Sequence, residues 1–179
     1  GVVNVTPDSF SNSTSSYNSD CAISNALELY NSGADIIDVG GESTRPGASP
    51  VSAEEEIQRV LPVVDKLVQQ GIPVSIDTRN SIVMTKAIAA GVSLVNDVSA
   101  FTYDPNSLAV IANSDVGIIL MHMQGIPETM QIDPKYSNGV VIDTYDYLSS
   151  RIAACIELGV TRDRICVDPG IGFGKTLSH

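Results

Sequence analysis

Three polar residues, Asp77, Asn96 and Asp168, each stand at the end of a short apolar run, in the sequences VSID, SLVND and ICVD. A buried carboxylate needs a partner, because desolvation otherwise drives it to its neutral form. A heterocycle with adjacent N–H donors can give a carboxylate two hydrogen bonds, and an Asn amide offers both a donor and an acceptor. The three residues therefore predict a site for a nitrogen heterocycle, although Asp and Asn are also favoured as helix caps.

Two further positions suit binding of a charged ligand. Asn4 lies within the apolar run GVVNV, where a polar side chain needs a hydrogen bond, a ligand or a metal. One Asn oxygen together with ligand phosphates is a common way to hold Mg²⁺. Arg45, within GGESTRPG, suits a carboxylate or a phosphate. A hydrogen-bonded core Asn and a solvated surface Arg remain the alternatives.

Several motifs that suggest other sites are incomplete. DPGIGFGKT places Pro169 where a P-loop needs its first Gly, and its evenly spaced glycines do not form the dinucleotide-binding GxGxxG. The sequence has neither HExxH nor a cluster of Cys and His, so no zinc site is predicted. His122 lies between two methionines, which is more typical of a packed imidazole than of a ligand.

The elements that must position these residues alternate along the chain. Apolar runs of strand length cover residues 1–5, 35–39, 72–76, 92–95, 116–121 and 165–167. Helical patterns cover residues 21–31, 53–70, 81–90, 106–113 and 142–158. Ser52 and Glu55 predict a capping box at the start of the second helix. Residues 6–20 are polar and lack helical periodicity, which is typical of a lid loop.

Such βα units fit either an open doubly wound sheet or a (β/α)8 barrel. In every unit a polar residue stands at or just after the carboxyl end of the strand: Asn4, Glu42, Asp77, Asn96 with Asp97, His122 and Asp168. Barrels build their sites from the ends of many strands, whereas open sheets bind mainly at one switch point. We therefore expect an α/β fold of the (β/α)8 TIM-barrel type. Because such a barrel usually needs about 250 residues, we expect one domain over residues 1–179, truncated at the C-terminus and at the N-terminus, with about six βα units.

Composition restricts the function classes. The net charge of −11 argues against a broad nucleic-acid surface, and no apolar run is long enough to span a membrane. Three cysteines without CxxC spacing argue against a disulfide scaffold. We expect an intracellular, reducing environment, with the cytoplasm as the compartment.

Five motifs, in this order, resemble the dihydropteroate synthase family: NVTPDSFS, DVGGESTRPG, SIDT, VNDVSA and VDPGIGFGK. The resemblance covers the whole chain and implies a pterin-binding (β/α)8 barrel. It implies condensation of 6-hydroxymethyl-7,8-dihydropterin pyrophosphate with p-aminobenzoate, giving 7,8-dihydropteroate and pyrophosphate in folate biosynthesis. Mg²⁺ as cofactor, competition by sulfonamides and a homodimer are further implications.

The resemblance also assigns roles to residues. Asp77, Asn96 and Asp168 would hold the pterin ring, with Met121 and Phe173 packed near it, together with Val98 and Ile119. Asn4 would bind Mg²⁺ and the pyrophosphate, and Thr44 would donate a hydrogen bond to the pyrophosphate. Arg45 and Pro46, with Phe10 from the first loop, would close over the aminobenzoate.

The family pattern also has a Lys on the seventh strand and an Arg-x-His on the eighth, which have no counterpart in this sequence; Lys175 is not that Lys. We therefore expect the 179 residues to be inactive alone and active within their parent protein. A pterin-binding methyltransferase domain would share the barrel and the Asp and Asn contacts, but GGESTRPG has no role there. A pterin or nucleobase binder without catalysis would need neither Asn4 with Mg²⁺ nor two long loops.

Overall fold

The six strands of the protein form one parallel sheet in a computed structural model that describes residues 1–6, 15–43, 51–127 and 129–179. The strands are β1 (Val2–Asn4), β2 (Ile37–Gly40), β3 (Val74–Asp77), β4 (Leu94–Asp97), β5 (Gly117–Met121) and β6 (Ile165–Asp168). Neighbours in the sheet are also neighbours in the sequence, in the order β1-β2-β3-β4-β5-β6. An open doubly wound sheet reverses its strand order at a switch point, so this order fits the barrel and not that alternative.

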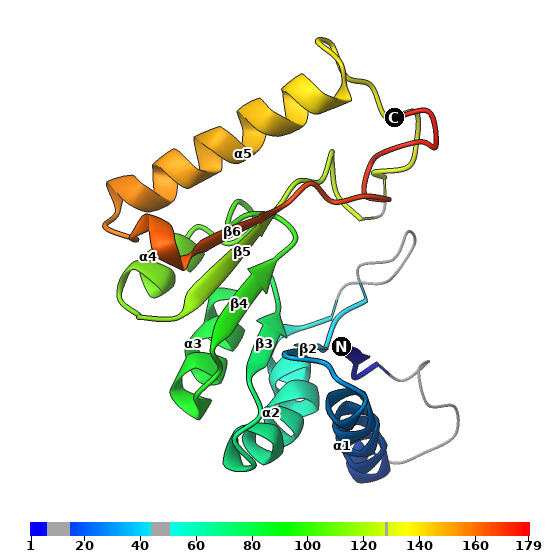
Figure 1. The fold of residues 1–179 in the computed structure, drawn as a ribbon, viewed down its shortest axis with the longest axis vertical. Helices are drawn as coiled ribbons and strands as arrows, with labels where there is room; N and C mark the ends of the chain where they lie inside the picture. The colour runs from blue at the N-terminus through cyan, green and yellow to red at the C-terminus, as the bar shows by residue number, and fades with distance from the viewer. Residues whose placement is uncertain (7–14, 44–50, 128) are drawn as a thin grey trace.

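Helices lie between successive strands and follow one another around the outside of the sheet (Figure 1). They are α1 (Ser15–Asn31), α2 (Ala53–Gln69), α3 (Ser81–Ala90), α4 (Ser107–Ala112) and α5 (Val140–Glu157), with a short 3₁₀ turn η2 (Arg162–Arg164) before β6. None of the helices in the described ranges has the length and hydropathy of a membrane span.

Side chains alternate strictly between the two faces of the sheet. One row, paired across all six strands, is apolar: Val3, Val39, Ile76, Val95, Ile118 and Ile165. Five of these are fully buried and belong to the same core cluster as helix residues such as Val64 and Leu67. This row therefore faces the helices, and the residues before and after it on each strand face the barrel interior.

Two adjacent glycines at the end of β2 show the two environments. A Cβ on Gly41 would lie 2.7 Å from Cγ1 of Val60 on α2, so only glycine lets this helix approach so closely. Gly40 points the other way, and a Cβ there would touch the side chains of Asn4 and Asp77. Gly41 therefore allows a close helix contact on one face of the sheet, and Gly40 borders the polar side chains on the other face.

The structure corrects one boundary by more than a few residues. The helix α1 begins at Ser15, whereas the sequence predicts a loop as far as residue 20. Once a helix has formed over the apolar pattern that follows, each further residue adds at small cost, even for weak helix formers such as Ser and Asn. The Ser52 half of the predicted capping box is confirmed, because its side chain accepts a hydrogen bond from the Glu55 N–H at 3.2 Å. The Glu55 carboxylate pairs instead with Arg59 on the next turn of the helix.

Candidate active site

Asn4, Asp77 and Asn96 lie at the same height on the interior face of the sheet. The strand pairing aligns Asn4 with Gly40, Gly40 with Asp77, and Asp77 with Asn96. In a parallel sheet, paired residues point to the same face, so the three side chains face the barrel interior near the carboxyl ends of their strands. Two of the three residues of the predicted heterocycle site, Asp77 and Asn96, therefore share one height with Asn4.

Gly40 keeps the space between Asn4 and Asp77 open. A Cβ on this glycine would be 3.5 Å from Oδ1 of Asn4 and 3.5 Å from Oδ2 of Asp77. The two side-chain oxygens thus flank a single point above the glycine backbone. Within the described residues, neither side chain makes a hydrogen bond, so both oxygens can accept from a ligand.

The environment of Asp77 favours its protonated form. Burial raises the pKa of this carboxyl well above its ordinary value, and the negative charges of Asp38 and Asp97 raise it further. A ligand that donates N–H groups to the carboxylate would replace the lost hydration and favour the charged form. The geometry therefore suits a ligand with donors on one edge, as the sequence predicts for a nitrogen heterocycle.

Asp38 is a site residue that the sequence prediction missed. It lies on β2, two residues before Gly40, and its Oδ2 accepts a hydrogen bond from Nδ2 of Asn96 at 3.2 Å. Burial raises its pKa, and the hydrogen bond from Asn96 opposes that rise. The sequence feature that could have identified Asp38 is a carboxylate inside the apolar run DIIDVG. It stands two residues before Gly40, and residues two apart on a strand face the same side of the sheet.

Asp168 and Met121 pair with each other one interior layer above Ile119 and Cys166. Oδ1 of Asp168 accepts the N–H of Gly170 at 2.7 Å, which leaves the other carboxylate oxygen available to a ligand. Met121 and Val98 are buried, whereas Ile119 and Phe173 are half-buried. These five predicted contacts thus lie on or directly after β4, β5 and β6, and contact with a pterin stays a prediction for each of them.

Two of the polar residues at strand ends are held by partners within the protein. Asp97 belongs to the helix side of β4, where its carboxylate accepts the N–H groups of Ser99 at 2.7 Å and Phe101 at 3.0 Å. Glu42 forms a buried ion pair with Arg79, with 2.9 Å between Oε2 and Nη2. Both carboxylates hold loops, so a polar residue at a strand end is not by itself a ligand contact.

The remaining predicted contacts, Phe10, Thr44, Arg45 and Pro46, lie outside the described residues. Among the described residues on either side of segment 44–50, Oε1 of Glu42 accepts the Val51 N–H at 3.4 Å.

Asn4 has the properties of a single protein ligand for Mg²⁺. In the described ranges no group of three or more His, Cys, Asp or Glu side chains is arranged to hold a metal. Mg²⁺ does not require such a group, because it keeps several waters and takes only one or two protein oxygens beside ligand phosphates. The Asn4 side chain is exposed, and its Oδ1 and the Asp77 Oδ2 lie around the same point above Gly40, so oxygen donors of the kind Mg²⁺ prefers are present.

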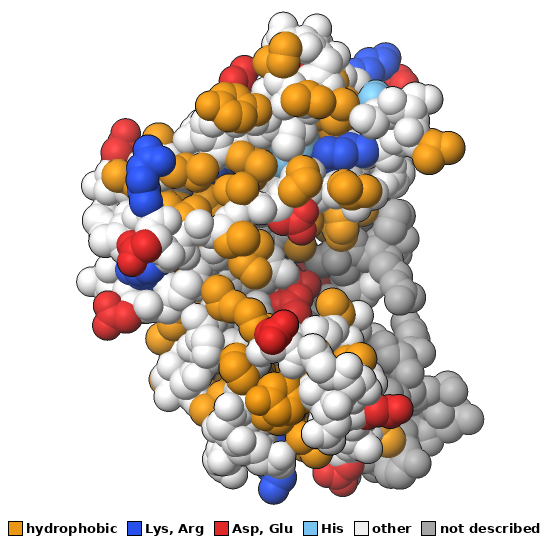
Figure 2. All heavy atoms as spheres, in the orientation of Figure 1, with side chains coloured by type: hydrophobic (Ala, Val, Ile, Leu, Met, Phe, Trp, Pro, Cys, Tyr) orange, Lys and Arg blue, Asp and Glu red, His pale blue; other side chains and the backbone are white. Residues whose placement is uncertain are grey.

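Several acidic side chains lie near the middle of the face shown in Figure 2, among hydrophobic ones. Together, the parallel βα units and the polar residues on their interior face define a barrel-type protein with a ligand site at the carboxyl ends of its strands. The whole chain, residues 1–179, matches the family of pterin binding enzymes. The chain therefore belongs to the pterin binding enzyme family.

Its relatives are dihydropteroate synthases. The chain is 49% identical to the enzyme of Neisseria meningitidis serogroup C, aligned over all of this chain and 64% of that protein. It superposes on the Yersinia pestis dihydropteroate synthase, solved as a sulfonamide drug complex, with a TM-score of 0.92 and 40% identity. It also superposes on the Burkholderia cenocepacia enzyme complexed with 7,8-dihydropteroate, with a TM-score of 0.85 and 43% identity. These matches cover 100% and 98% of this chain but only 65% and 59% of those chains.

Proposed function

We propose that the chain forms six βα units of a dihydropteroate synthase, and that its parent protein condenses 6-hydroxymethyl-7,8-dihydropterin pyrophosphate with p-aminobenzoate, giving 7,8-dihydropteroate and pyrophosphate. The observation that carries the proposal is the common height of Asn4, Asp77 and Asn96 on the interior face, in a chain that is 49% identical to a named dihydropteroate synthase. The domain boundaries of the parent protein, its homodimer and a reducing cytoplasmic location remain predictions.

The pterin ring suits the polar side chains of the interior face. Its 2-amino group and adjacent ring N–H match a carboxylate such as Asp77 or Asp168, and Asn96 can pair with another edge. Asp168 has one oxygen free for this purpose, because the other accepts the Gly170 N–H. Met121 and Phe173 would supply the apolar contact to the faces of the ring.

The pyrophosphate needs positive charge, and the described residues at this end of the barrel carry mainly negative charge. The carboxylates of Asp38, Asp97, Glu42 and Glu56 all raise the pKa of Asp77 by their negative charge. The nearby cations Arg79 and Lys175 are already engaged, Arg79 by Glu42 and Lys175 by loop carbonyls. We therefore expect Asn4 to hold Mg²⁺, which would neutralise the pyrophosphate as its bond to the pterin breaks. The residues of GGESTRPG complete this part of the proposal through the family resemblance.

The main requirement of the reaction is the correct orientation of its two substrates. The aminobenzoate nitrogen attacks the methylene carbon of the pterin, the bond from that carbon to the pyrophosphate oxygen breaks, and the nitrogen loses a proton. An aromatic amine is nucleophilic without a strong base, so the site needs no activated Ser, Cys or His. The protein contributes by holding the pterin with its methylene carbon directed toward the amine.

The test uses the complete protein that carries this chain. It is incubated with dihydropterin pyrophosphate, p-aminobenzoate and Mg²⁺, and dihydropteroate is followed by mass spectrometry. We expect product from the wild type and losses of about 100-fold or more for Asp77→Ala and Asn96→Ala, because each removes a hydrogen bond to the pterin. Asp65→Ala, an exposed change on α2, is the matched control and should leave the rate unchanged.

The other outcomes separate the alternatives. Pterin binding without release of pyrophosphate would contradict the synthase proposal and favour a binding protein. Transfer of a methyl group from a methylated pterin to a corrinoid would instead favour the related methyltransferases. Omission of Mg²⁺ should abolish product, and restoration by added Mg²⁺ should fail in Asn4→Ala at concentrations that restore the wild type.

A further inference from the structure

The Lys175 ammonium is enclosed by acceptors from two loops at the end of the barrel. Its Nζ lies 2.9 Å from Nδ1 of His122, and donates to the carbonyl oxygens of Gly170 at 3.0 Å and Phe173 at 3.1 Å. The carbonyl of His122 itself is 3.4 Å away. An ammonium has three N–H donors, so these contacts use its full capacity and leave none for a ligand.

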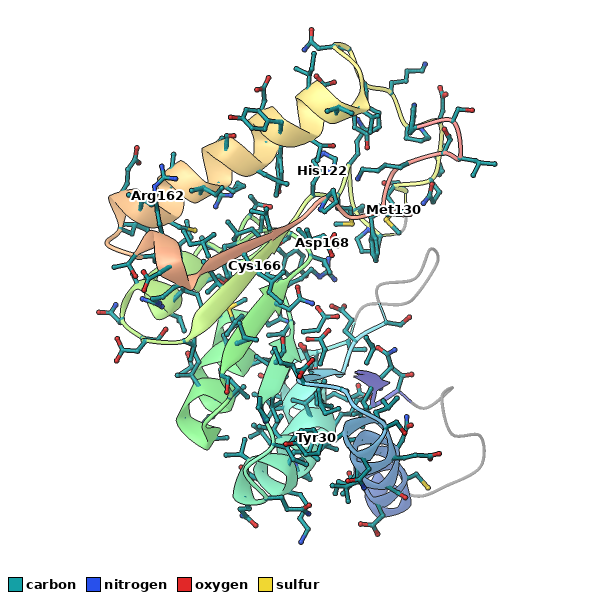
Figure 3. The ribbon with its side chains drawn as sticks, viewed as in Figure 1. Tyr30, His122, Met130, Arg162, Cys166 and Asp168 are labelled. Atoms are coloured by element: carbon teal, nitrogen blue, oxygen red, sulfur yellow. The ribbon has the colours of Figure 1, made fainter. Side chains whose placement is uncertain are left out.

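This ammonium joins the segment after β5 to the segment after β6. His122 follows β5, and its backbone N–H donates to the carbonyl of Asp168 at 3.0 Å, at the end of β6. Gly170 and Phe173 belong to the turn that follows Asp168, where the Phe173 N–H donates to the Gly170 carbonyl at 3.0 Å. Figure 3 shows His122 and Asp168 close together where β5 and β6 end.

The hydrogen bonds of Lys175 therefore hold the turn after β6, next to which lie two residues proposed to contact the pterin, Asp168 and Phe173. The Asp168 carboxylate accepts the N–H of Gly170, whose carbonyl is held by Lys175. The Phe173 carbonyl is held by the same ammonium, which restricts the backbone that carries the Phe173 ring. Lys175 thus controls the position of one polar and one aromatic contact without touching the ligand.

His122 can serve as an acceptor only when Nδ1 carries no proton. Its ring packs edge-on against Tyr147, with 5.1 Å between centroids, and lies 6.0 Å from Tyr136. Burial lowers the pKa of His122, the charge of Lys175 lowers it further, and Asp143 opposes this. The titratable and charged groups around the ring are Tyr136 before α5, Asp143 and Tyr147 on α5, Asp168 at the end of β6, and Lys175 in the segment after β6.

We propose that Lys175 is a positioning residue for pterin binding, acting through Asp168 and Phe173, and that it requires neutral His122 as its acceptor. The proposal rests on the proposed function, because the ligand it concerns is the pterin. Protonation of His122 would place two cations 2.9 Å apart, and the turn after β6 would lose its anchor.

Four variants of the complete protein test the proposal. Lys175→Met removes the ammonium but keeps the length of the side chain, and Lys175→Arg keeps a charge with a different donor geometry. His122→Asn keeps an acceptor near the Nδ1 position that cannot be protonated. Lys86→Met is the matched control, because it makes the same change on the exposed face of α3.

The first measurement is the affinity for 6-hydroxymethyl-7,8-dihydropterin, without pyrophosphate, by titration calorimetry at pH 7.5. We expect Lys175→Met to weaken binding by about 10-fold to 100-fold, since several charge-assisted hydrogen bonds are lost. Lys175→Arg should recover part of the affinity, and Lys86→Met should match the wild type. The KM for p-aminobenzoate should change less than twofold in Lys175→Met, a selectivity that a general loss of folding would not produce.

The second measurement is the same affinity between pH 7.5 and pH 5.5. Wild-type binding should weaken as the pH falls, whereas His122→Asn should retain more of its affinity, the difference growing below the ordinary His pKa of 6.5. Identical pH profiles for wild type and His122→Asn would overturn the role of His122, even if Lys175→Met failed to fold. Unchanged pterin affinity in folded Lys175→Met would overturn the role of Lys175.

The two proposals fail in different ways. If the complete protein binds pterin but forms no dihydropteroate, the synthase proposal fails, and the binding measurements still test Lys175. If it forms dihydropteroate and Lys175→Met binds pterin normally, the proposed function stands and the positioning role is wrong.

Discussion

The side-chain amide of Asn96 donates to the carboxylate of Asp38 across the intervening strand β3, with 3.2 Å between Nδ2 and Oδ2. This contact fixes which end of the amide faces Asp38, so the Asn96 oxygen is left to accept from a ligand. It also keeps a second negative charge near Asp77, whose pKa is raised in part by Asp38.

Loss of Asp38 should therefore weaken pterin binding although Asp38 is not one of the residues that the family resemblance assigns. We expect Asp38→Ala to lower the affinity of the complete protein for the pterin by about tenfold, since the Asn96 amide becomes free to rotate. Asp38→Asn retains an acceptor for Nδ2 and should lose less. Asp35→Ala, an exposed carboxylate in the same segment, is the control for calorimetric titration. Equal losses in Asp35→Ala and Asp38→Ala would contradict this role.

The turn after β6 should tolerate a side chain at one glycine and not at another. A Cβ on Gly170 would lie 2.0 Å from the His122 carbonyl oxygen, whereas a Cβ on Gly172 meets nothing within 4 Å. Both have positive φ, +66° and +91°, so both substitutions carry backbone strain of about 1 kcal/mol. Only Gly170→Ala must also displace the turn, and its urea unfolding free energy should fall by at least about 2 kcal/mol more than that of Gly172→Ala. Similar losses would show that the contact with His122 is not tight.

Replacement of only one partner of the buried ion pair between Glu42 and Arg79 should lower the free energy of unfolding strongly. Both side chains are less than 10% exposed, and the guanidinium also lies over the Tyr103 ring at 4.2 Å. Arg79→Met leaves a buried carboxylate without its partner, and should cost about 3 kcal/mol of unfolding free energy. The double variant Glu42→Gln with Arg79→Met should cost less than Arg79→Met alone.

The exposed pair Lys135–Asp133 provides the comparison for that cycle. Its side chains are 80% and 73% exposed, so Lys135→Met should cost less than about 0.5 kcal/mol. Additive costs for the two changes at Glu42 and Arg79 in urea unfolding would contradict a stabilising interaction between them.

The buried carboxylate of Glu56 predicts a specific pH dependence of stability. Glu56 is fully buried on α2, its Oε2 accepts from Asn80 at 2.7 Å, and its Oε1 has no partner. Burial raises its pKa above the ordinary 4.5, so the folded state holds this proton to higher pH than the unfolded state does. Its contribution is therefore complete below pH 4.5 and is lost as the pH rises through the raised pKa.

Glu56→Gln should remove this dependence while keeping an oxygen for Asn80. We expect the variant to gain on the order of 1 kcal/mol relative to the wild type at pH 7.5, with the gain shrinking toward pH 4.5. Glu54→Gln, an exposed change two residues earlier, should show no such trend. The measurement is the midpoint of urea unfolding at pH 7.5 and at pH 4.5. A stability gain of Glu56→Gln that grows on acidification would contradict a raised pKa for Glu56.

The sequence was sufficient to place the strands and to collect most of the interior polar residues, because each stands at the end of an apolar run. It could not separate Asn96 from its neighbour Asp97, since only the strand pairing decides which of the two faces the interior. Asp38 was missed because it lies inside its strand, whereas the sequence pattern considered only polar residues at strand ends. The start of α1 was missed because residues 15–20 have no apolar periodicity, and their helix depends on the residues that follow.

The alternation of side chains between the two faces of the sheet, seen at Gly40 and Gly41, restricts where residues can be inserted in proteins of this kind. One residue inserted within β3 before Asp77 would exchange the two faces beyond it, and would send Asp77 toward the helices. Two inserted residues would restore the face but would shift the side chain by about 6.6 Å along the strand. Insertions and deletions should therefore accumulate between strands, where neither the direction nor the height of an interior residue depends on them.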